Sequence, residues 1–404
     1  MATQDAIHKS KRQYITSSTF IFVVAIISLA STLRTPLTGV GPVISSIRDG
    51  LGISNVLAGF LTTIPLLAFA VVSPFAPRIS HRFGIEKTLF YSIILLTVGI
   101  ILRSLGTTPL LIFGTILIGV AISFGNVLVP SFFKLKYPLR IGLLTGIYTV
   151  SMNISGAIAV GISNPIAMNS NWGWQGALAI SVILTLIALV IWIPLLRGEK
   201  VQPNHISTSS AHLSEIKIWR KPLAWAIAIT MGLQSLLFYC STAWLPEILI
   251  SQGYDADKAG YLTSVMQMAQ IPMTFLIPIF AEKLRSQRPF VYIFTILYLI
   301  GFVGLFFNLT HFTVLWMICI GLAGGASFGI IMMLFTLRTK TAYEAAQISG
   351  FAQSVGYLLA AAGPVLFGFF HDITGSWNVP NLLFIAAVFI LFLTAFISAK
   401  DRYL

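Results

Sequence analysis

Long apolar stretches make up most of the chain, and polar residues gather in short segments between them. A helix needs ~20 mostly apolar residues to cross a bilayer, and several of these stretches carry the glycine and proline that membrane helices tolerate. The pattern predicts an all-α integral membrane protein with twelve transmembrane helices. We expect them at residues 15–47, 54–76, 86–105, 108–133, 141–166, 174–196, 222–248, 257–281, 289–308, 312–336, 346–370 and 379–399.

Composition supports lipid as the surrounding solvent. Hydrophobic residues form 56% of the 404 positions and charged residues 9%, against roughly 25% charged residues in a soluble domain. Both cysteines, Cys240 and Cys319, lie in apolar stretches, which argues against a disulfide scaffold. The first stretch follows Lys9, Lys11 and Arg12, as in a signal peptide, but no small-residue cleavage site follows it. We therefore expect a retained helix.

The net charge is +13, and the distribution of its basic residues along the chain indicates the orientation in the membrane. If the N-terminus is cytoplasmic, 21 of the 25 Lys and Arg residues fall in cytoplasmic segments, and Arg48, Arg103 and Lys258 fall outside. This is the positive-inside pattern. It predicts a multi-pass protein of the cell membrane with both termini cytoplasmic and the lipid bilayer as its partner. Nucleic-acid binding loses its support.

The chain repeats itself. Residues 58–62 (AGFLT) match 259–263 (AGYLT) at an offset of 201, and 123–125 match 327–329 (SFG in both) at an offset of 204. Two six-helix halves joined by a polar segment form the architecture of a secondary transporter, whose site lies near the midplane. We predict an N-terminal half at 1–196, a cytoplasmic linker at 197–221 and a C-terminal half at 222–404.

Two matching helices carry polar stripes, because each has three polar positions spaced four residues apart. A polar stripe in lipid is costly, so both should face a water-filled cavity or protein. Hydrogen bonding between helices uses the same residue types and remains an alternative. The stripes are Thr145, Thr149 and Asn153 in one half and Ser349, Gln353 and Tyr357 in the other.

The segment at 77–84 (PRISHRFG), expected as a loop after the second helix, resembles the loop signature of the major facilitator superfamily. Its counterpart at 278–283 (PIFAEK) follows the eighth helix. The resemblance implies a cytoplasmic gate at these loops. His81 stands where the family pattern has an acidic residue, so the N-terminal half lacks the acidic member of that charge relay. The implied gate residues are Arg78, His81, Arg82, Glu282 and Lys283.

Further stretches resemble the cyanate permease/2-nitroimidazole transporter family within that superfamily. The resemblance covers nearly the whole chain and implies the major facilitator fold, with transport of small anionic or heteroaromatic nitrogen compounds. It implies no cofactor. The stretches are 33–36 with 41–42, 125–130, 145–149, 232–239, 244–246, 353–357 and 371–377.

Arg34 is the one Lys or Arg in the interior of a predicted span, away from its ends. At the bilayer centre it costs ~2.5–3.5 kcal/mol even on the lenient insertion scale. Ser31, Thr35 and Thr38 share its face and can orient it without neutralising it. Every Asp and Glu falls in a tail, a loop or a span end. The missing partner is therefore predicted to be the substrate, either an anion or a solute with a strongly electron-rich acceptor, held by the guanidinium fork. Snorkelling to the surface or binding helix carbonyls are the alternatives.

The C-terminal half offers no basic equivalent, since Arg34 maps onto Phe238. Gln234 and Tyr239 supply hydrogen bonds without charge, and aromatic faces suit a flat solute. Asn126 is a further candidate, or a cap for carbonyls freed by Pro130. The predicted substrate-binding set is Arg34, Asn126, Thr149, Asn153, Gln234, Phe238, Tyr239, Gln353 and Tyr357.

Enzyme chemistry finds no support. The six histidines show no paired metal-ligand spacing, there is no phosphate loop of the GxxxxGK[ST] type, and no catalytic group, metal or cofactor is expected. We predict a monomeric solute carrier that works by alternating access. A multidrug exporter of the same superfamily and a non-transporting membrane sensor are the alternatives.

Overall fold

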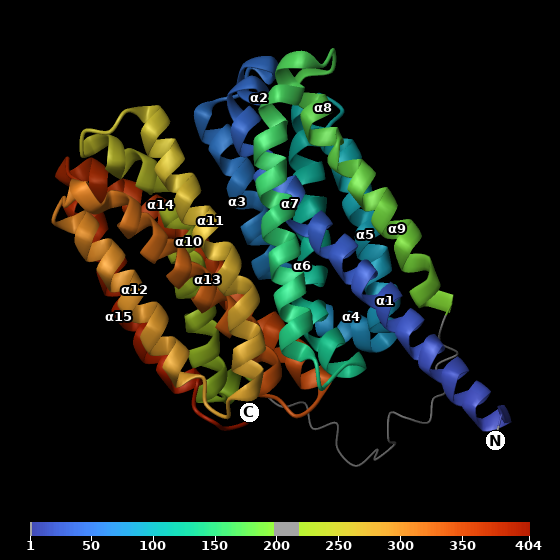
Figure 1. The fold of residues 1–404 in the computed structure, drawn as a ribbon. Coiled ribbons are helices and arrows are strands. Elements are labelled where there is room, and N and C mark those ends of the chain that lie inside the picture. Colours follow the sequence, from blue (N-terminus) through green and yellow to red (C-terminus); the bar gives the residue numbers. More distant parts are fainter. Residues whose placement is uncertain (1, 198–217) are drawn as a thin grey trace.

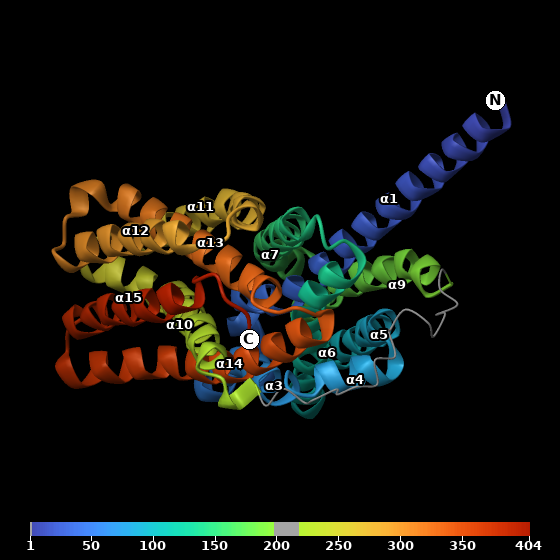
Figure 2. The same ribbon diagram turned by 90° about the horizontal axis from the view of Figure 1, so that it is seen from below.

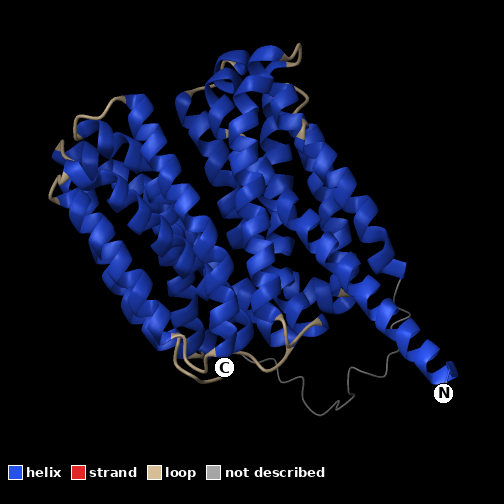
Figure 3. Ribbon diagram, viewed as in Figure 1, coloured by secondary structure: helices blue, strands red, loops and turns tan. Residues whose placement is uncertain are grey.

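The computed structural model describes residues 2–197 and 218–404, so most of the predicted linker lies outside the described residues. The described chain consists of helices and loops (Figure 3). The all-α prediction is confirmed, because a backbone in lipid satisfies its own hydrogen bonds within helices.

The N-terminal half contains ten helical elements in the described residues. They are α1 (Ala2–Thr38), η1 (Gly41–Val43), α2 (Ile44–Leu51), α3 (Asn55–Val72), α4 (Ala76–Phe83), α5 (Ile85–Arg103), α6 (Thr108–Lys136), α7 (Ile141–Asn169), α8 (Gly173–Ala179) and α9 (Ser181–Arg197).

The C-terminal half contains eight elements in the described residues. They are η2 (Ile218–Arg220), α10 (Pro222–Ser251), α11 (Ala256–Lys283), α12 (Arg288–Phe306), η3 (Thr310–Phe312), α13 (Thr313–Leu337), α14 (Ala342–Thr374) and α15 (Asn378–Ser398).

Eleven helices in the described residues are long and apolar enough to cross a membrane, and the bent pair α3–α4 makes a twelfth span. The expected loop at 77–84 is wrong in one respect, because α4 is helical and bends by 61° from α3. Pro77 sits in its first turn, and Gly84 ends it at a φ of 87° that favours glycine. The expected loop at 278–283 is likewise the last part of α11.

The two halves form separate bundles (Figures 1 and 2). In the first, α1 packs on α7 and α5 on α6; in the second, α10 packs on α14 and α11 on α13. Both chain ends lie on the same side of the molecule, which we call the terminal side (Figure 1). The helices of the two halves diverge toward the opposite side.

Contacts between the halves lie toward the terminal side. α14 packs on α3, where Ser354 Oγ donates to the Ala70 carbonyl at 2.6 Å and Gly350 lies against the Ser73 carbonyl. Farther from the terminal side, the matched repeat positions Gly59 and Gly260 have no atom within 4 Å of the point where a Cβ would lie. The molecule is therefore joined on the terminal side and open around these two glycines.

We predict that Gly350→Ala weakens the terminal-side contact, because its Cβ would lie 2.5 Å from the Ser73 carbonyl oxygen. Overpacking of this kind costs about 1–3 kcal/mol. Spin labels at the exposed positions Arg82 and Lys340 should report longer distances in pulsed EPR. Gly260→Ala is the matched control, since it makes the same helix substitution in open space. Identical distance distributions in all three proteins would contradict the prediction.

Candidate substrate site

Arg34 lies in α1, one turn before that helix ends at Thr38, and its side chain is partly exposed. Its Nη1 donates a hydrogen bond to Asn153 Oδ1 of α7 at 2.8 Å. Its Cζ lies 4.9 Å from the centroid of the Phe238 ring of α10, within the range of a cation–π contact. The guanidinium therefore joins the two halves at the level where their helices meet.

The hydroxyls expected to orient Arg34 bind the backbone instead. Ser31 Oγ donates to the Ile27 carbonyl, and Thr35 Oγ1 donates to the Ser31 carbonyl. Thr38 Oγ1 donates to the carbonyl of Gly156 in α7 at 3.0 Å. The guanidinium is thus oriented by α7 and α10, and these hydroxyls tie α1 to itself and to α7.

Aromatic side chains surround the guanidinium from both halves. The hydroxyls of Tyr148, Tyr239 and Tyr357 interact electrostatically with Arg34. The Tyr357 ring lies 4.9 Å from the Phe69 ring, and the Tyr239 ring packs edge-on against Phe238 at 5.3 Å. The sequence prediction missed Tyr148 and Phe69, because their aromatic signal is shared by many lipid-facing positions.

Asn126 and Asn153 connect this cluster to neighbouring helices. Tyr148 donates its hydroxyl proton to Asn126 Oδ1 at 3.2 Å. Asn153 Nδ2 donates to Thr274 Oγ1 of α11 at 3.2 Å, so its amide bridges Arg34 and the C-terminal half. The structure therefore brings six predicted residues together: Arg34, Asn126, Asn153, Phe238, Tyr239 and Tyr357.

No carboxylate approaches the cluster in the described part of the chain. Every described Asp and Glu side chain is at least partly exposed, and Arg34 forms no ion pair with any of them. Glu247, near the far end of α10, is exposed. No group of three His, Cys, Asp or Glu side chains suited to a metal ion occurs among these residues. Within the described residues, the positive charge of Arg34 is met by neutral dipoles and aromatic faces alone.

The other three predicted residues are buried, and each donates a hydrogen bond to a protein group, while the amide oxygen of Gln353 has no partner among the described residues. Thr149 Oγ1 donates to the Thr274 carbonyl across the halves at 2.9 Å. Gln353 Nε2 donates to the Asn126 carbonyl, also across the halves, at 3.0 Å. Gln234 Nε2 donates to Ser235 Oγ within α10. For Thr149 and Gln353 the structure thus favours helix–helix bonding over a cavity face.

Of the five predicted gate residues, Glu282 forms hydrogen bonds with the other half, and the other four are exposed. The Glu282 carboxylate, at the end of α11, accepts hydrogen bonds from the N–H groups of Ile141 and Gly142, both at 2.9 Å. These N–H groups open α7, where a helix N-terminus favours an anion. Lys283 lies 5.9 Å from the ring of Phe280 in its own helix.

Arg78, His81 and Arg82 are exposed on α4. The His81 ring lies 5.2 Å from the ring of Tyr343 in α14, in place of an acidic contact. Lys134, which the sequence analysis did not single out, supplies a second charged contact: its Nζ donates to the carbonyls of Thr336 and Thr339 at the end of α13. No sequence signal identifies a backbone carbonyl as a partner.

Comparison with known proteins identifies the family. Residues 19–364 match the Major Facilitator Superfamily. The chain belongs to that superfamily. Like its relatives, it is a multi-pass membrane transporter.

Relatives with curated names cover most of this superfamily chain. An uncharacterized transporter of Bacillus subtilis is 45% identical over 95% of each chain. A 2-nitroimidazole transporter of Escherichia coli is 40% identical over 89% of this chain and 90% of its own. A cyanate transport protein of Escherichia coli is 24% identical over 88% and 91%. These relatives confirm the predicted resemblance.

The fold agrees with solved structures of the superfamily. The proton:xylose symporter XylE matches with a TM-score of 0.74 at 14% identity, over 96% of this chain and 98% of that one. At this identity the likeness concerns the fold alone. It confirms the two six-helix repeats predicted for this superfamily member.

We predict that Asn153→Leu and Gln353→Leu act differently, although both remove a buried or half-buried amide from a stripe. Asn153→Leu removes the hydrogen bond of Arg34 and should weaken solute binding about tenfold or more, as for a bond to a charged group. Gln353→Leu removes a contact between halves and should lower the melting temperature with little change in affinity. Binding titrations and thermal melts on both variants check this, and equal effects on affinity would contradict it.

Proposed function

We propose that this transporter carries a small anionic or nitrogen-containing organic solute by alternating access, with Arg34 as the counter-charge of the solute. The observation that carries the proposal is the partly exposed Arg34, which meets no carboxylate among the described residues. A charge at this depth is costly unless a partner or water satisfies it. An anionic solute supplies that partner each time it binds.

The chemistry of the guanidinium supports this assignment. It offers five N–H donors in a planar fork, and Asn153 takes a hydrogen bond from Nη1. The remaining donors suit paired oxygens, such as those of a carboxylate or a nitro group. Since Asn153 is neutral, it orients the fork without cancelling its charge.

The aromatic surroundings favour a flat solute. Phe238 and Tyr239 from α10 are partly exposed, and Tyr357 lies on α14. Aromatic faces stack on planar groups, and the phenol hydroxyls offer donors and acceptors at their edges. The names of two relatives, which refer to 2-nitroimidazole and to cyanate, support small nitrogen compounds as the class to test first.

We also propose that the terminal side is cytoplasmic, because most basic residues lie in the segments on that side. The conformation described here is then closed to the cytoplasm and open outward. Glu282 on the N-terminus of α7 and Lys134 on the C-terminus of α13 would act as its cytoplasmic gate contacts. We infer that one chain suffices for transport, since both repeats contribute to the site.

A multidrug exporter is the second candidate from the sequence. Exporters of cationic drugs use carboxylates within the membrane, and none of the described Asp or Glu residues is buried. The lone charge at the site is positive. The structure offers no observation that favours this candidate or a membrane sensor over an anion carrier.

We predict that Arg34→Ala abolishes saturable uptake of cyanate, 2-nitroimidazole and small carboxylates into proteoliposomes. Arg34→Lys should remain at least about tenfold impaired, because a point charge replaces a bidentate fork. Arg285→Ala, at an exposed terminal-side position, is the control and should transport normally. Size-exclusion profiles confirm folding. Normal uptake by a folded Arg34→Ala protein would refute the counter-charge.

We predict that a pH gradient alone does not drive accumulation of a solute that stays ionised. Proton coupling needs a group that titrates within the membrane, and none of the described Asp, Glu or His side chains is buried. Flux into proteoliposomes at fixed membrane potential measures this. Strong accumulation that disappears in Glu247→Gln would show that this exposed carboxylate carries the proton.

A further inference from the structure

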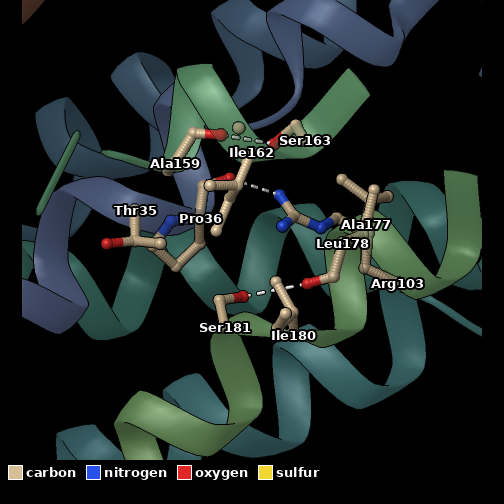
Figure 4. A pocket seen from close by; sticks show the side chains of 11 residues that line it. Thr35, Pro36, Arg103, Ala159, Ile162, Ser163, Ala177, Leu178, Ile180 and Ser181 are labelled. Atoms are coloured by element: carbon tan, nitrogen blue, oxygen red, sulfur yellow. Dashed lines mark hydrogen bonds between the residues drawn. The ribbon is translucent and has the colours of Figure 1, made fainter. Parts of the chain in front are cut away.

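A small pocket lies inside the N-terminal half, beside the end of α1 (Figure 4). Its lining comes from α1, α5, α7 and the kink between α8 and α9. Arg103, the last residue of α5, points into it and is 2% exposed. The sequence analysis assigned Arg103 to an outer segment and gave no sign that its side chain is buried inside the N-terminal bundle.

Arg103 binds the end of the helix that carries Arg34. Its Nη1 donates to the carbonyl of Pro36 at 2.7 Å. Pro36 lies in the last turn of α1, where carbonyl groups lack a helical N–H partner and where a positive charge is favourable. Arg34 lies two residues earlier in the same turn.

No acidic group competes for Arg103 in the described part of the chain. It forms no ion pair there, and its Nε has no hydrogen-bond partner. The pocket has room for about one water molecule, so a solute does not fit beside the guanidinium. The ligand of this buried cation is therefore the helix end itself.

The chain following α1 gives its end little support of its own. After Thr38 the helix breaks, and η1 begins at Gly41 with Pro42 inside it. On the α7 side, Thr38 Oγ1 binds the Gly156 carbonyl, and a Cβ at Gly39 would lie 3.0 Å from Ser163 Oγ. Arg103 supplies a further contact from α5, so the last turn of α1 is held by both α5 and α7.

We propose that Arg103 is a positioning residue for Arg34: by binding the Pro36 carbonyl it fixes the last turn of α1 and thereby aims the Arg34 guanidinium at the solute. This inference rests on the proposed function of Arg34. Recognition of paired oxygens by a planar fork depends on alignment within fractions of an ångström. A helix end released by about one ångström keeps Arg34 in the site but misaligns its donors.

The test compares Arg103→Met, Arg103→Lys and Arg103→Gln in the full-length protein. Titrations use cyanate, 2-nitroimidazole and benzoate as probes. Arg103→Met should weaken probe binding about tenfold, as expected for one lost charge-assisted hydrogen bond, and Arg103→Lys should recover most of it. If Arg103→Met fails to fold, Arg103→Gln, which keeps a donor without charge, should show an intermediate loss.

Hydrogen–deuterium exchange provides a readout that needs no solute. Peptides covering residues 30–44 should exchange faster in Arg103→Met, while peptides from α12 in the other half stay unchanged. Thr97→Val is the matched control, because it removes from the same helix a buried hydroxyl whose one hydrogen bond among the described residues is to the Ile93 carbonyl. It should alter neither exchange at 30–44 nor probe affinity.

The outcomes separate this inference from the proposed function. If Arg34→Ala abolishes binding while Arg103→Met and Arg103→Gln bind within about twofold of the wild type, the positioning role is wrong and the counter-charge stands. If Arg103→Met speeds exchange equally in α12, the residue only stabilises the fold and the inference is overturned. If Arg34→Ala binds every probe normally, the counter-charge itself fails.

Discussion

An arginine among apolar helices, with no carboxylate partner in the described part of the chain, is the constraint on which the rest of this site depends. Arg34 is placed by a neutral amide from α7 and an aromatic face from α10. Neither cancels its charge, and aliphatic lipid would not tolerate it. The helices around it must therefore leave it access to water or to an anion, which is why the two halves meet here without sealing over it.

Three charged side chains outside the site act on helix ends. Glu282 binds the N-terminus of α7, Lys134 the C-terminus of α13 and Arg103 the C-terminus of α1. Backbone groups at helix ends lack a hydrogen-bond partner within the helix. Each contact therefore satisfies the backbone group and the charged side chain together. The first two cross between the halves and would break if the halves rock as proposed, whereas the third stays inside one half.

The sequence was sufficient to predict the helices and to single out Arg34. Lipid forces the backbone into long apolar helices, and a lone charge among them is conspicuous. It was insufficient where a side chain binds a backbone group, or where packing on a neighbouring helix determines the local structure. Spacing placed Thr149 and Gln353 on one face, but only the packed structure shows the carbonyls of Thr274 and Asn126 opposite them. The helical form of α4 depends on its junction with α3, and the family signature is compatible with a loop as well. Arg103 looked like an interfacial residue because Pro36 carries no sequence signal as an acceptor.

The neutral partner of Arg34 has an electrical consequence. If an anion pairs with this guanidinium, the loaded site has no net charge and the empty site is positive. The membrane potential then acts mainly on the empty carrier as it returns, with up to about 2.3 kcal/mol per 100 mV if the full charge crosses the field. With the interior negative, the empty carrier is drawn toward the cytoplasmic-facing state. Because Asn153 is neutral, the resting orientation of the proposed carrier is then sensitive to voltage.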